Sequence, residues 1–367
     1  MWETKTMGAA NPHAFLEVWL YHDETKDADL KEGKRHAHII LVVPERLTLE
    51  SPHGMQTLFE ADPEVTTPRS EFLFRIQEIR TDTQYSGELH ASSMSGKQWG
   101  KRECCGARVL DLASEFLRHK GPKGELPAPF FRFGALFFPP KTPSLRTFYS
   151  GDDPEKKIQY FETLMRMAIK GVLHYGYSDL EQVYPKIEVT ILGLILDGDE
   201  HLKRPIDQDR VIERLRGELR PGLAISPDFE IRAVDSDPKT HTPGTRDYDD
   251  CELLQVADLL LGAVRFVADG SYHGLCPPET AAPKLFAKLG SRAEKMAWVY
   301  LSICELLKKK AARLRKSPKA WKHSGHYRSF TISRAELDGE KWQFWEVEWE
   351  YDEGSGHLLP LFPDLSY

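Results

Sequence analysis

A chain of 367 residues, 41% hydrophobic and 29% charged, has the composition of an ordinary globular protein and the length of one large domain or two smaller ones. Its net charge of −7 argues against a surface that binds nucleic acid everywhere. The five cysteines form no CxxC pair and no metal spacing, which favours a reducing compartment. The chain opens without an apolar signal core, and no apolar run approaches the roughly 18 residues of a membrane span. We therefore expect a cytoplasmic protein without a membrane segment.

Two strands with acids at the end of the first are predicted near the start of the chain. Residues 15–21 (FLEVWLY) and 38–43 (HIILVV) are rich in aromatic and aliphatic residues and favour an antiparallel pair. Asp23 and Glu24 follow the first strand. Because successive side chains of a strand point to opposite faces, only one of these acids is expected in any one site, and Asp23 is favoured. Taken alone, Asp23 would more simply be a strand-end acid facing solvent or capping a turn.

Two further acids flank predicted core elements in the middle of the chain. Glu88 precedes a helical stretch at about residues 99–119, and taken alone it would be a surface acid. An amphipathic helix is predicted at residues 154–175. The continuous apolar run at residues 186–196 predicts a central strand that is covered on both faces, and Asp197 follows it directly.

The strongest single element is a helix predicted over residues 249–266. Asp249 has the position of a cap, and Glu252 follows at the spacing of a capping box. Two adjacent apolar stripes indicate that most of the helix surface is buried.

One narrow strip of this helix is different, since Gln255, Asp258, Gly262 and Arg265 follow one another at about one turn. A carboxylate in the middle of a largely buried helix needs a cation, a metal or several donors. A metal or catalytic role for Asp258 is favoured over a simple ion pair with Arg265 or another arginine. Gly262 is a poor helix former that allows a close approach by another segment.

A basic segment marks the C-terminal part of the chain. Residues 306–328 hold nine Lys and Arg residues and no acid, with aromatic residues between them. A solvated helix face and contact with a phosphate backbone, with bases stacked on the aromatics, explain this run equally well. The candidate nucleic-acid-binding residues are Lys308, Lys309, Lys310, Arg313, Arg315, Lys316, Lys319, Lys322 and Arg328.

The tail alternates tryptophan and phenylalanine with glutamate over residues 342–351, which predicts a strand. It is expected to close a small C-terminal sheet with residues 329–333. The long apolar helices and this Trp-rich tail make a homodimer or a partner protein plausible.

In chain order, Asp23 follows a strand, Glu88 precedes a helix, Asp197 follows a strand and Asp258 lies within a helix. The ribonuclease H-like fold places its metal-binding carboxylates in this way. Carboxylates are suitable ligands for Mg²⁺ or Mn²⁺, and two such ions about 4 Å apart would stabilise the attacking and leaving oxygens of a phosphodiester. No quartet of cysteines and histidines competes as a zinc site.

The sequence resembles the bacterial family known as domain of unknown function 3800, which belongs to the ribonuclease H-like superfamily. The first strand of that family ends in Asp-Glu-Ser-Gly; here the two acids match and the Ser-Gly does not. The most specific match is a Leu-Gln-x-Ala-Asp-Leu helix, and the resemblance covers about residues 15–268. The matching segments are Asp23-Glu24-Thr25-Lys26, Glu88-Leu89-His90-Ala91, Asp197, Asp235-Ser236 and Leu254-Gln255-Val256-Ala257-Asp258-Leu259.

The resemblance implies an α/β fold in which residues 1–268 form a ribonuclease H-like mixed β-sheet flanked by helices. Residues 269–367 are then an α+β C-terminal extension, helical with a small Trp-rich β-element. The implied function is that of a metal-dependent nuclease with two Mg²⁺ or Mn²⁺ ions and a DNA or RNA substrate, in anti-phage defence or a mobile element. The implied metal-binding and catalytic residues are Asp23, Glu88, Asp197 and Asp258.

Two alternatives stay open at this point. The same fold could be a non-catalytic binding or assembly module for a protein or nucleic acid, with the acids in structural ion pairs. A site that acts on a nucleotide or another small phosphorylated molecule fits the overall acidity better than long DNA does.

Overall fold

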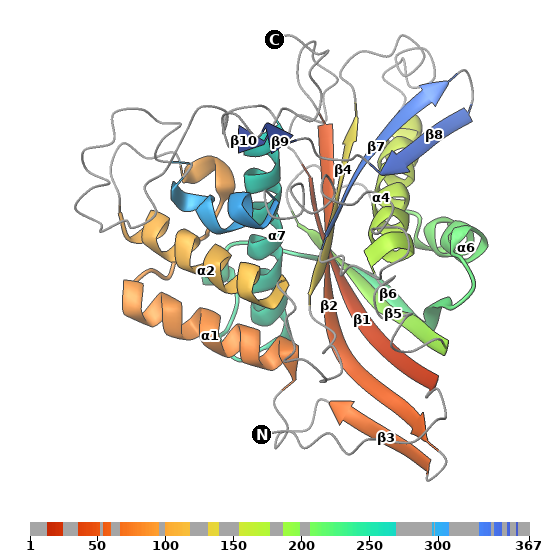
Figure 1. The fold of residues 1–367 in the computed structure, drawn as a ribbon, viewed down its shortest axis with the longest axis horizontal. Coiled ribbons are helices and arrows are strands. Elements are labelled where there is room, and N and C mark those ends of the chain that lie inside the picture. Colours follow the sequence, from red (N-terminus) through yellow and green to blue (C-terminus); the bar gives the residue numbers. More distant parts are fainter. Residues whose placement is uncertain are drawn as a thin grey trace.

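A mixed sheet of eight strands runs through the centre of the computed structural model (Figure 1). The predicted α/β class, with a mixed sheet flanked by helices, is confirmed. The structure describes residues 13–24, 36–51, 54–59, 67–94, 100–117, 131–138, 154–176, 186–198, 206–268, 296, 298–307, 330–338, 341–346, 351–352 and 357–358.

The strands of the main sheet follow the order β6-β5-β1-β2-β4-β7-β8, and β3 pairs with β2. Strand β1 is antiparallel to β2 and parallel to β5, β5 is parallel to β6, and β2 is antiparallel to β4. Strands β9 and β10 pair with each other in a separate two-stranded sheet. The bounds are β1 His13–Glu24, β2 His36–Ser51, β3 Gly54–Phe59, β4 Arg132–Phe138, β5 Lys186–Asp197, β6 Leu223–Val234, β7 Phe330–Asp338, β8 Lys341–Glu346, β9 Tyr351–Asp352 and β10 His357–Leu358.

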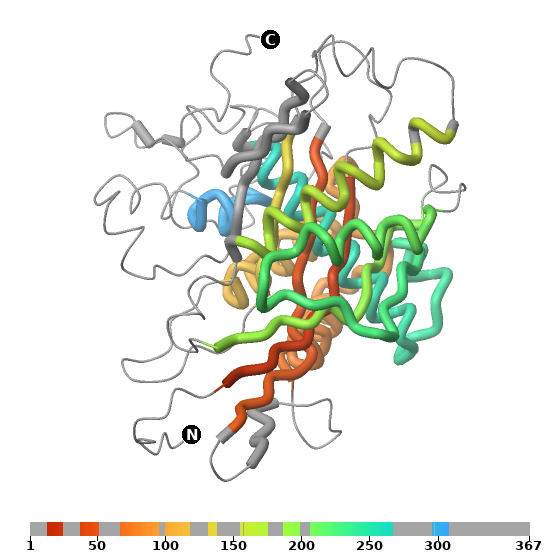
Figure 2. Tube along the Cα trace, turned by 90° about the vertical axis from the view of Figure 1, so that its right-hand side faces the viewer, coloured from red at the N-terminus to blue at the C-terminus, as the bar shows by residue number. Residues whose placement is uncertain are grey.

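Helices cover both faces of this sheet. Helices α1, α2 and α7 lie on one face and α4 and α6 on the other (Figure 1), and the α4–α6 layer faces the viewer in Figure 2. We call these the α7 face and the α4 face. The bounds are α1 Pro68–Thr83, α2 Lys101–Leu117, α4 Pro154–Gly176, α6 Gln208–Glu218 and α7 Arg246–Ala268, with 3₁₀ turns η1 at Ala91–Ser93 and η3 at Pro238–Thr240.

Two apolar cores lie on the two faces of the sheet. Leu20 of β1 belongs to the core under α4, and its neighbour Tyr21 belongs to the core under α7. In β5, Leu194 and Leu196 face α4 while Ile195 faces α7. The prediction of a central strand covered on both faces is therefore confirmed for β5. None of the described helices is long and apolar enough to cross a membrane.

Helix α7 begins three residues earlier than predicted, at Arg246. Asp249 therefore does not cap it: the Tyr248 amide donates to Thr245 Oγ1 at 3.4 Å, one position before the helix. The predicted capping box is wrong because Glu252 has a different partner, Arg80 of α1, whose Nε donates to it at 3.0 Å. A buried arginine is a stronger partner for a carboxylate than a backbone amide at the helix end.

The predicted pairing of the two C-terminal strands is confirmed, since β7 is antiparallel to β8. The hairpin does not form a sheet of its own, because β7 also pairs in parallel with β4 and extends the main sheet. Residues 301–307 are helical, and Ile303 and Leu307 are buried in the core on the α7 face. The nine candidate nucleic-acid-binding residues between Lys308 and Arg328 lie outside the described residues.

Candidate functional site

The carboxyl ends of β1 and β5 lie side by side in the middle of the sheet. These strands are parallel, and His22 is the partner of Leu196 in their register. Asp23 and Asp197 follow at the next position of each strand. Parallel strands end at the same edge of a sheet, so the two acids predicted from separate strand ends meet there.

Asp23 is buried at this edge and interacts with two other acids. Burial raises the pKa of Asp23 well above its ordinary value, and the negative charges of Asp258 and Asp197 raise that pKa further. A hydrogen bond between the carboxyl groups of Asp23 and Asp258 also raises this pKa. Apart from that contact, the buried Oδ2 of Asp23 has no hydrogen-bond partner among the described residues. Three of the predicted site residues are thus brought together on the α7 face of the sheet. We call Asp23, Asp197 and Asp258 the carboxylate cluster.

Asp258 is oriented by a segment that follows α1. The Ala91 amide donates to Asp258 Oδ2 at 2.6 Å, and His90 Nδ1 lies 2.7 Å from the same oxygen. A Cβ atom added to Gly262, one turn along α7, would lie 2.5 Å from the Cβ of Ala91. The expectation that Gly262 permits a close approach is confirmed, since any larger residue would push residues 84–94 away from Asp258.

Arg80 forms hydrogen bonds with both the 84–94 segment and α7. Its guanidinium donates to the backbone oxygens of Tyr85 and Gly87, at 3.3 and 2.9 Å. The same group donates to Glu252 and, at 2.8 Å, to Gln255 Oε1. The polar strip predicted on α7 therefore contacts the 84–94 segment, with Gln255 one turn before Asp258.

Glu88 is placed differently from the other three predicted ligands. Its Oε1 accepts a hydrogen bond from Ser236 Oγ at 3.0 Å, and Ser236 follows β6 at the neighbouring strand end. Glu88 therefore lies at the same edge of the sheet, but its described contact is with a hydroxyl group and not with the carboxylate cluster.

The carboxylate cluster has the donors that Mg²⁺ or Mn²⁺ requires. Both ions prefer oxygen ligands, and Asp23 supplies a buried oxygen that has no other described partner. The Ala91 and His90 contacts hold Asp258 from behind, as outer partners commonly hold a ligating carboxylate. The donor atoms of the cluster therefore have the right chemistry for a divalent cation. Their spacing is wider than a single ion requires, since among the described residues only His22, Glu24 and His38 place one ligating atom each within 4.8 Å of the other two.

Sequence reasoning missed two features of this region. The sequence assigns no role to His90, although the partly buried Asp258 on α7 requires a polar partner. On the opposite face, His22 Nε2 lies 2.9 Å from His38 Nδ1, and Glu24 Oε2 lies 3.8 Å from the same His38 nitrogen. Burial lowers the pKa of His22 to about 3. The available signal was the alternation His22-x-Glu24, which places both side chains on one face of a strand.

No family model, no curated protein and no solved structure matches this chain.

Proposed function

We propose that the protein is a metal-dependent hydrolase of phosphodiester bonds and that the carboxylate cluster holds its metal ions. The observation that carries the proposal is the buried carboxyl group of Asp23, which interacts with the carboxyl groups of Asp258 and Asp197 and has no other hydrogen-bond partner for Oδ2 among the described residues. Such an arrangement costs stability when the acids are ionised. A divalent cation would offset both the burial and the mutual repulsion.

The strand order supports a ribonuclease H-like fold for this protein. Strands β1, β2 and β4 are antiparallel neighbours, with β3, α1 and α2 between β2 and β4 in the chain. Strands β5 and β6 continue the sheet in parallel on the other side of β1. Strand β1 carries Asp23 as its penultimate residue, the neighbouring strand β5 ends in Asp197, and α7 covers them with a third aspartate. The resemblance to the domain of unknown function 3800 family predicts this arrangement of strands and acids, so we extend the proposal to membership of that family.

The proposed roles follow from the contacts of each side chain. Asp23 and Asp197 would hold the ions from the sheet, and Asp258 would hold them from α7 in the orientation fixed by Ala91 and His90. When bound, Mg²⁺ or Mn²⁺ would activate a water molecule and stabilise the leaving oxygen of the phosphodiester. Ser236 donates to Glu88 Oε1, so Oε2 is the Glu88 oxygen that would join the ligands.

A nucleic-acid substrate is proposed from the basic segment between Lys308 and Arg328. Nine cations without an acid could neutralise several phosphates despite the net charge of −7. This part of the proposal stands on sequence alone, since the segment lies outside the described residues.

The first test is a thermal melt with chelator, Mg²⁺ or Mn²⁺ on the wild type and on Asp258→Asn. A ligand at about 100 times its dissociation constant stabilises the native state by about 2.7 kcal/mol, so a rise in Tm of several degrees is expected in the wild type alone. The exposed Asp209 of α6 provides a matched control, Asp209→Asn, which should keep the full rise.

The second test is cleavage of labelled single- and double-stranded DNA and RNA with the same ions. Asp23→Asn and Asp258→Asn should abolish cleavage, and Asp209→Asn should not. Full cleavage by both cluster variants would refute the catalytic assignment. A metal-dependent rise in Tm without cleavage of any of these substrates would instead favour the binding module or a small phosphorylated substrate.

A further inference from the structure

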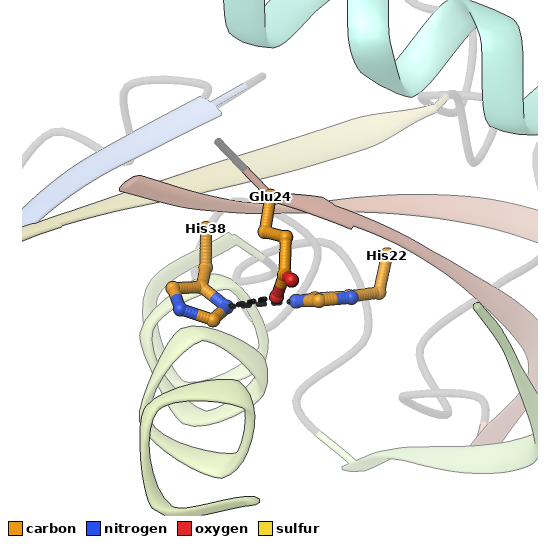
Figure 3. Close-up of side chains that lie close together, drawn as sticks. All are labelled: His22, Glu24 and His38. Atoms are coloured by element: carbon orange, nitrogen blue, oxygen red, sulfur yellow. Dashed lines mark hydrogen bonds and ion pairs between the residues drawn. The ribbon is translucent and has the colours of Figure 1, made fainter. Parts of the chain in front are cut away.

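A second group of potential ligands lies at the end of β1, on the α4 face of the sheet. His22 and Glu24 are two residues apart on β1, and His38 of β2 is the direct cross-strand partner of Glu24. One ligating atom from each residue lies within 4.8 Å of the other two. Figure 3 shows the three side chains converging on the side of the sheet away from α7. The group is therefore separated from the carboxylate cluster by the sheet itself.

The distances within the group suit a common metal ion. Two ligands at about 2.0–2.1 Å from a metal, at an angle of 90° to 110°, lie about 2.9–3.4 Å apart. His22 Nε2 and His38 Nδ1 are 2.9 Å apart, which is already within this range. Glu24 Oε2 is 3.8 Å from His38 Nδ1, so a small adjustment of the glutamate side chain would complete the set.

The two histidines of the group are buried, whereas the glutamate is partly exposed to solvent. His22 and His38 are 2% and 5% exposed, and both rings pack against Phe161 of α4 with centroids 5.5 and 5.7 Å away. The Glu24 side chain is 21% exposed, so the group reaches solvent on the glutamate side. An ion entering there would contact one ligating atom from each of the three residues, with the Phe161 ring packed behind the two histidines. The two imidazoles are held in place, because His22 and His38 stand on neighbouring strands and the Phe161 ring packs against both.

We infer that His22, Glu24 and His38 bind one divalent transition-metal ion of the zinc type. Two imidazole nitrogens and one carboxylate are the ligands of zinc and its neighbours in the first transition row, whereas Mg²⁺ prefers oxygen alone. The bound ion would join the ends of β1 and β2, and it would be chemically distinct from the ions of the carboxylate cluster. This inference does not depend on the proposed function. The competing explanation is a hydrogen-bonded pair of histidines with a neighbouring glutamate and no affinity for metal.

The test is a titration of the chelator-treated full chain with Co²⁺, followed by visible absorption and by competition with Zn²⁺. The variants are Glu24→Gln and His38→Gln. Asp23→Asn is the matched control, because it lies between two of the ligands on the same strand but points to the other face. Circular dichroism on each variant confirms that the sheet is intact, and Glu24→Gln remains informative if His38→Gln does not fold, because Glu24 is partly exposed.

Excess Mg²⁺ is present to occupy the carboxylate cluster. One Co²⁺ that is displaced by Zn²⁺ is then expected in the wild type and in Asp23→Asn, with affinity lowered at least tenfold in Glu24→Gln and His38→Gln. Three results would overturn the inference: no bound Co²⁺ in the wild type, unchanged affinity in folded Glu24→Gln, or a sulfur-to-cobalt charge-transfer band, which would assign the ion to cysteine. Loss of Mg²⁺ or Mn²⁺ stabilisation in Asp23→Asn with retained Co²⁺ binding would establish two separate sites.

Discussion

The ion pair between Arg80 and Glu252 connects the segment that positions Asp258 to the rest of the fold, so its removal is a direct test of the packing described above. Both side chains are buried, at 7% and 2% exposure, and Arg80 Nε lies 2.7 Å from Glu252 Oε1. Replacing Arg80 with methionine keeps most of the volume and removes all five of its described hydrogen bonds.

The expected cost follows from the partners that Arg80 leaves behind. A buried ion pair that loses one member destabilises a protein by about 3–5 kcal/mol, because the other charge stays buried without compensation. The carbonyl groups of Tyr85 and Gly87 also lose their donor, which adds to that cost unless water reaches them. Arg80→Met should therefore lower the free energy of unfolding by at least about 3 kcal/mol, a large share of the stability of a typical domain.

The assay is urea denaturation of Arg80→Met, Glu252→Met and the double variant, with the coupling free energy taken from the cycle. Removing both charges spares the protein an uncompensated ion, so the double variant should recover at least about 2 kcal/mol relative to the sum of the single changes. A loss below about 1 kcal/mol in Arg80→Met, or additive single effects, would refute the reasoning.

The pH dependence gives this prediction a second readout. Burial raises the pKa of Glu252, while Arg80 lowers it, so removal of Arg80 should raise that pKa further. A carboxyl group whose folded pKa exceeds its unfolded pKa costs stability as the pH rises through that interval. The deficit of Arg80→Met should therefore shrink as the pH falls toward the ordinary pKa of a glutamate.

Two further predictions concern the cluster and its glycine. Burial and the neighbouring acids raise the pKa of Asp23. In chelator, Asp23→Asn should therefore be more stable than the wild type above neutral pH, and the free energies of unfolding of the two proteins should converge toward pH 4. Parallel curves of stability against pH over that range would contradict the assigned cause. Gly262→Ala should lose about 1–3 kcal/mol in urea denaturation, because its Cβ would lie 2.5 Å from Ala91 and 2.6 Å from Tyr300 Oη. Gly217→Ala in α6, where a Cβ meets nothing within 4 Å, should instead be neutral or gain up to about 1 kcal/mol, and equal effects at the two glycines would count against overpacking.

Local patterns were sufficient to predict most of the helices and strands, though not β3 or α1, and the three acids of the carboxylate cluster. The apolar run of β5 and the stripes of α7 follow from periodicity, which depends on neighbours in the sequence. Asp23 and Asp197 could be expected at one edge of the sheet because both follow predicted strands. Asp258 could be expected in a site because a carboxylate on a largely buried helix needs a compensating partner. These inferences needed no knowledge of which strands pair.

The contacts that depend on distant partners could not be predicted in the same way. Arg80 and Glu252 are 172 positions apart, and nothing in either local sequence selects the other. The capping box failed for this reason, since Glu252 is at the correct spacing for a local bond but has a better long-range partner. The addition of β7 to β4 is a similar case, because an open strand edge accepts any suitable strand and leaves no mark in the side-chain pattern.

The faces of the acids depend on two β-bulges. On β5, Val189 and Ile191 face α4, so simple alternation would place Asp197 on that face as well, away from Asp23. The register with β1 skips position 192, after which Leu194 and Leu196 face α4 and Asp197 falls on the α7 face.

A similar β-bulge on β2 determines which face of the sheet His38 lies on. The register of β1 with β2 passes from Arg46 to Pro44 and leaves Glu45 out. Leu47 and Leu49, on the C-terminal side of Glu45, face α4. On its N-terminal side the even-numbered residues Ile40 and Val42 face α4, so His38 is on the α4 face with Glu24. Strand β1 alternates without interruption, and its last residues serve both faces. The neighbouring strands therefore determine the composition of each group: one bulge brings Asp197 to Asp23, and the other brings His38 to His22 and Glu24. A one-residue change in either bulge would separate the ligands without altering a single ligating residue.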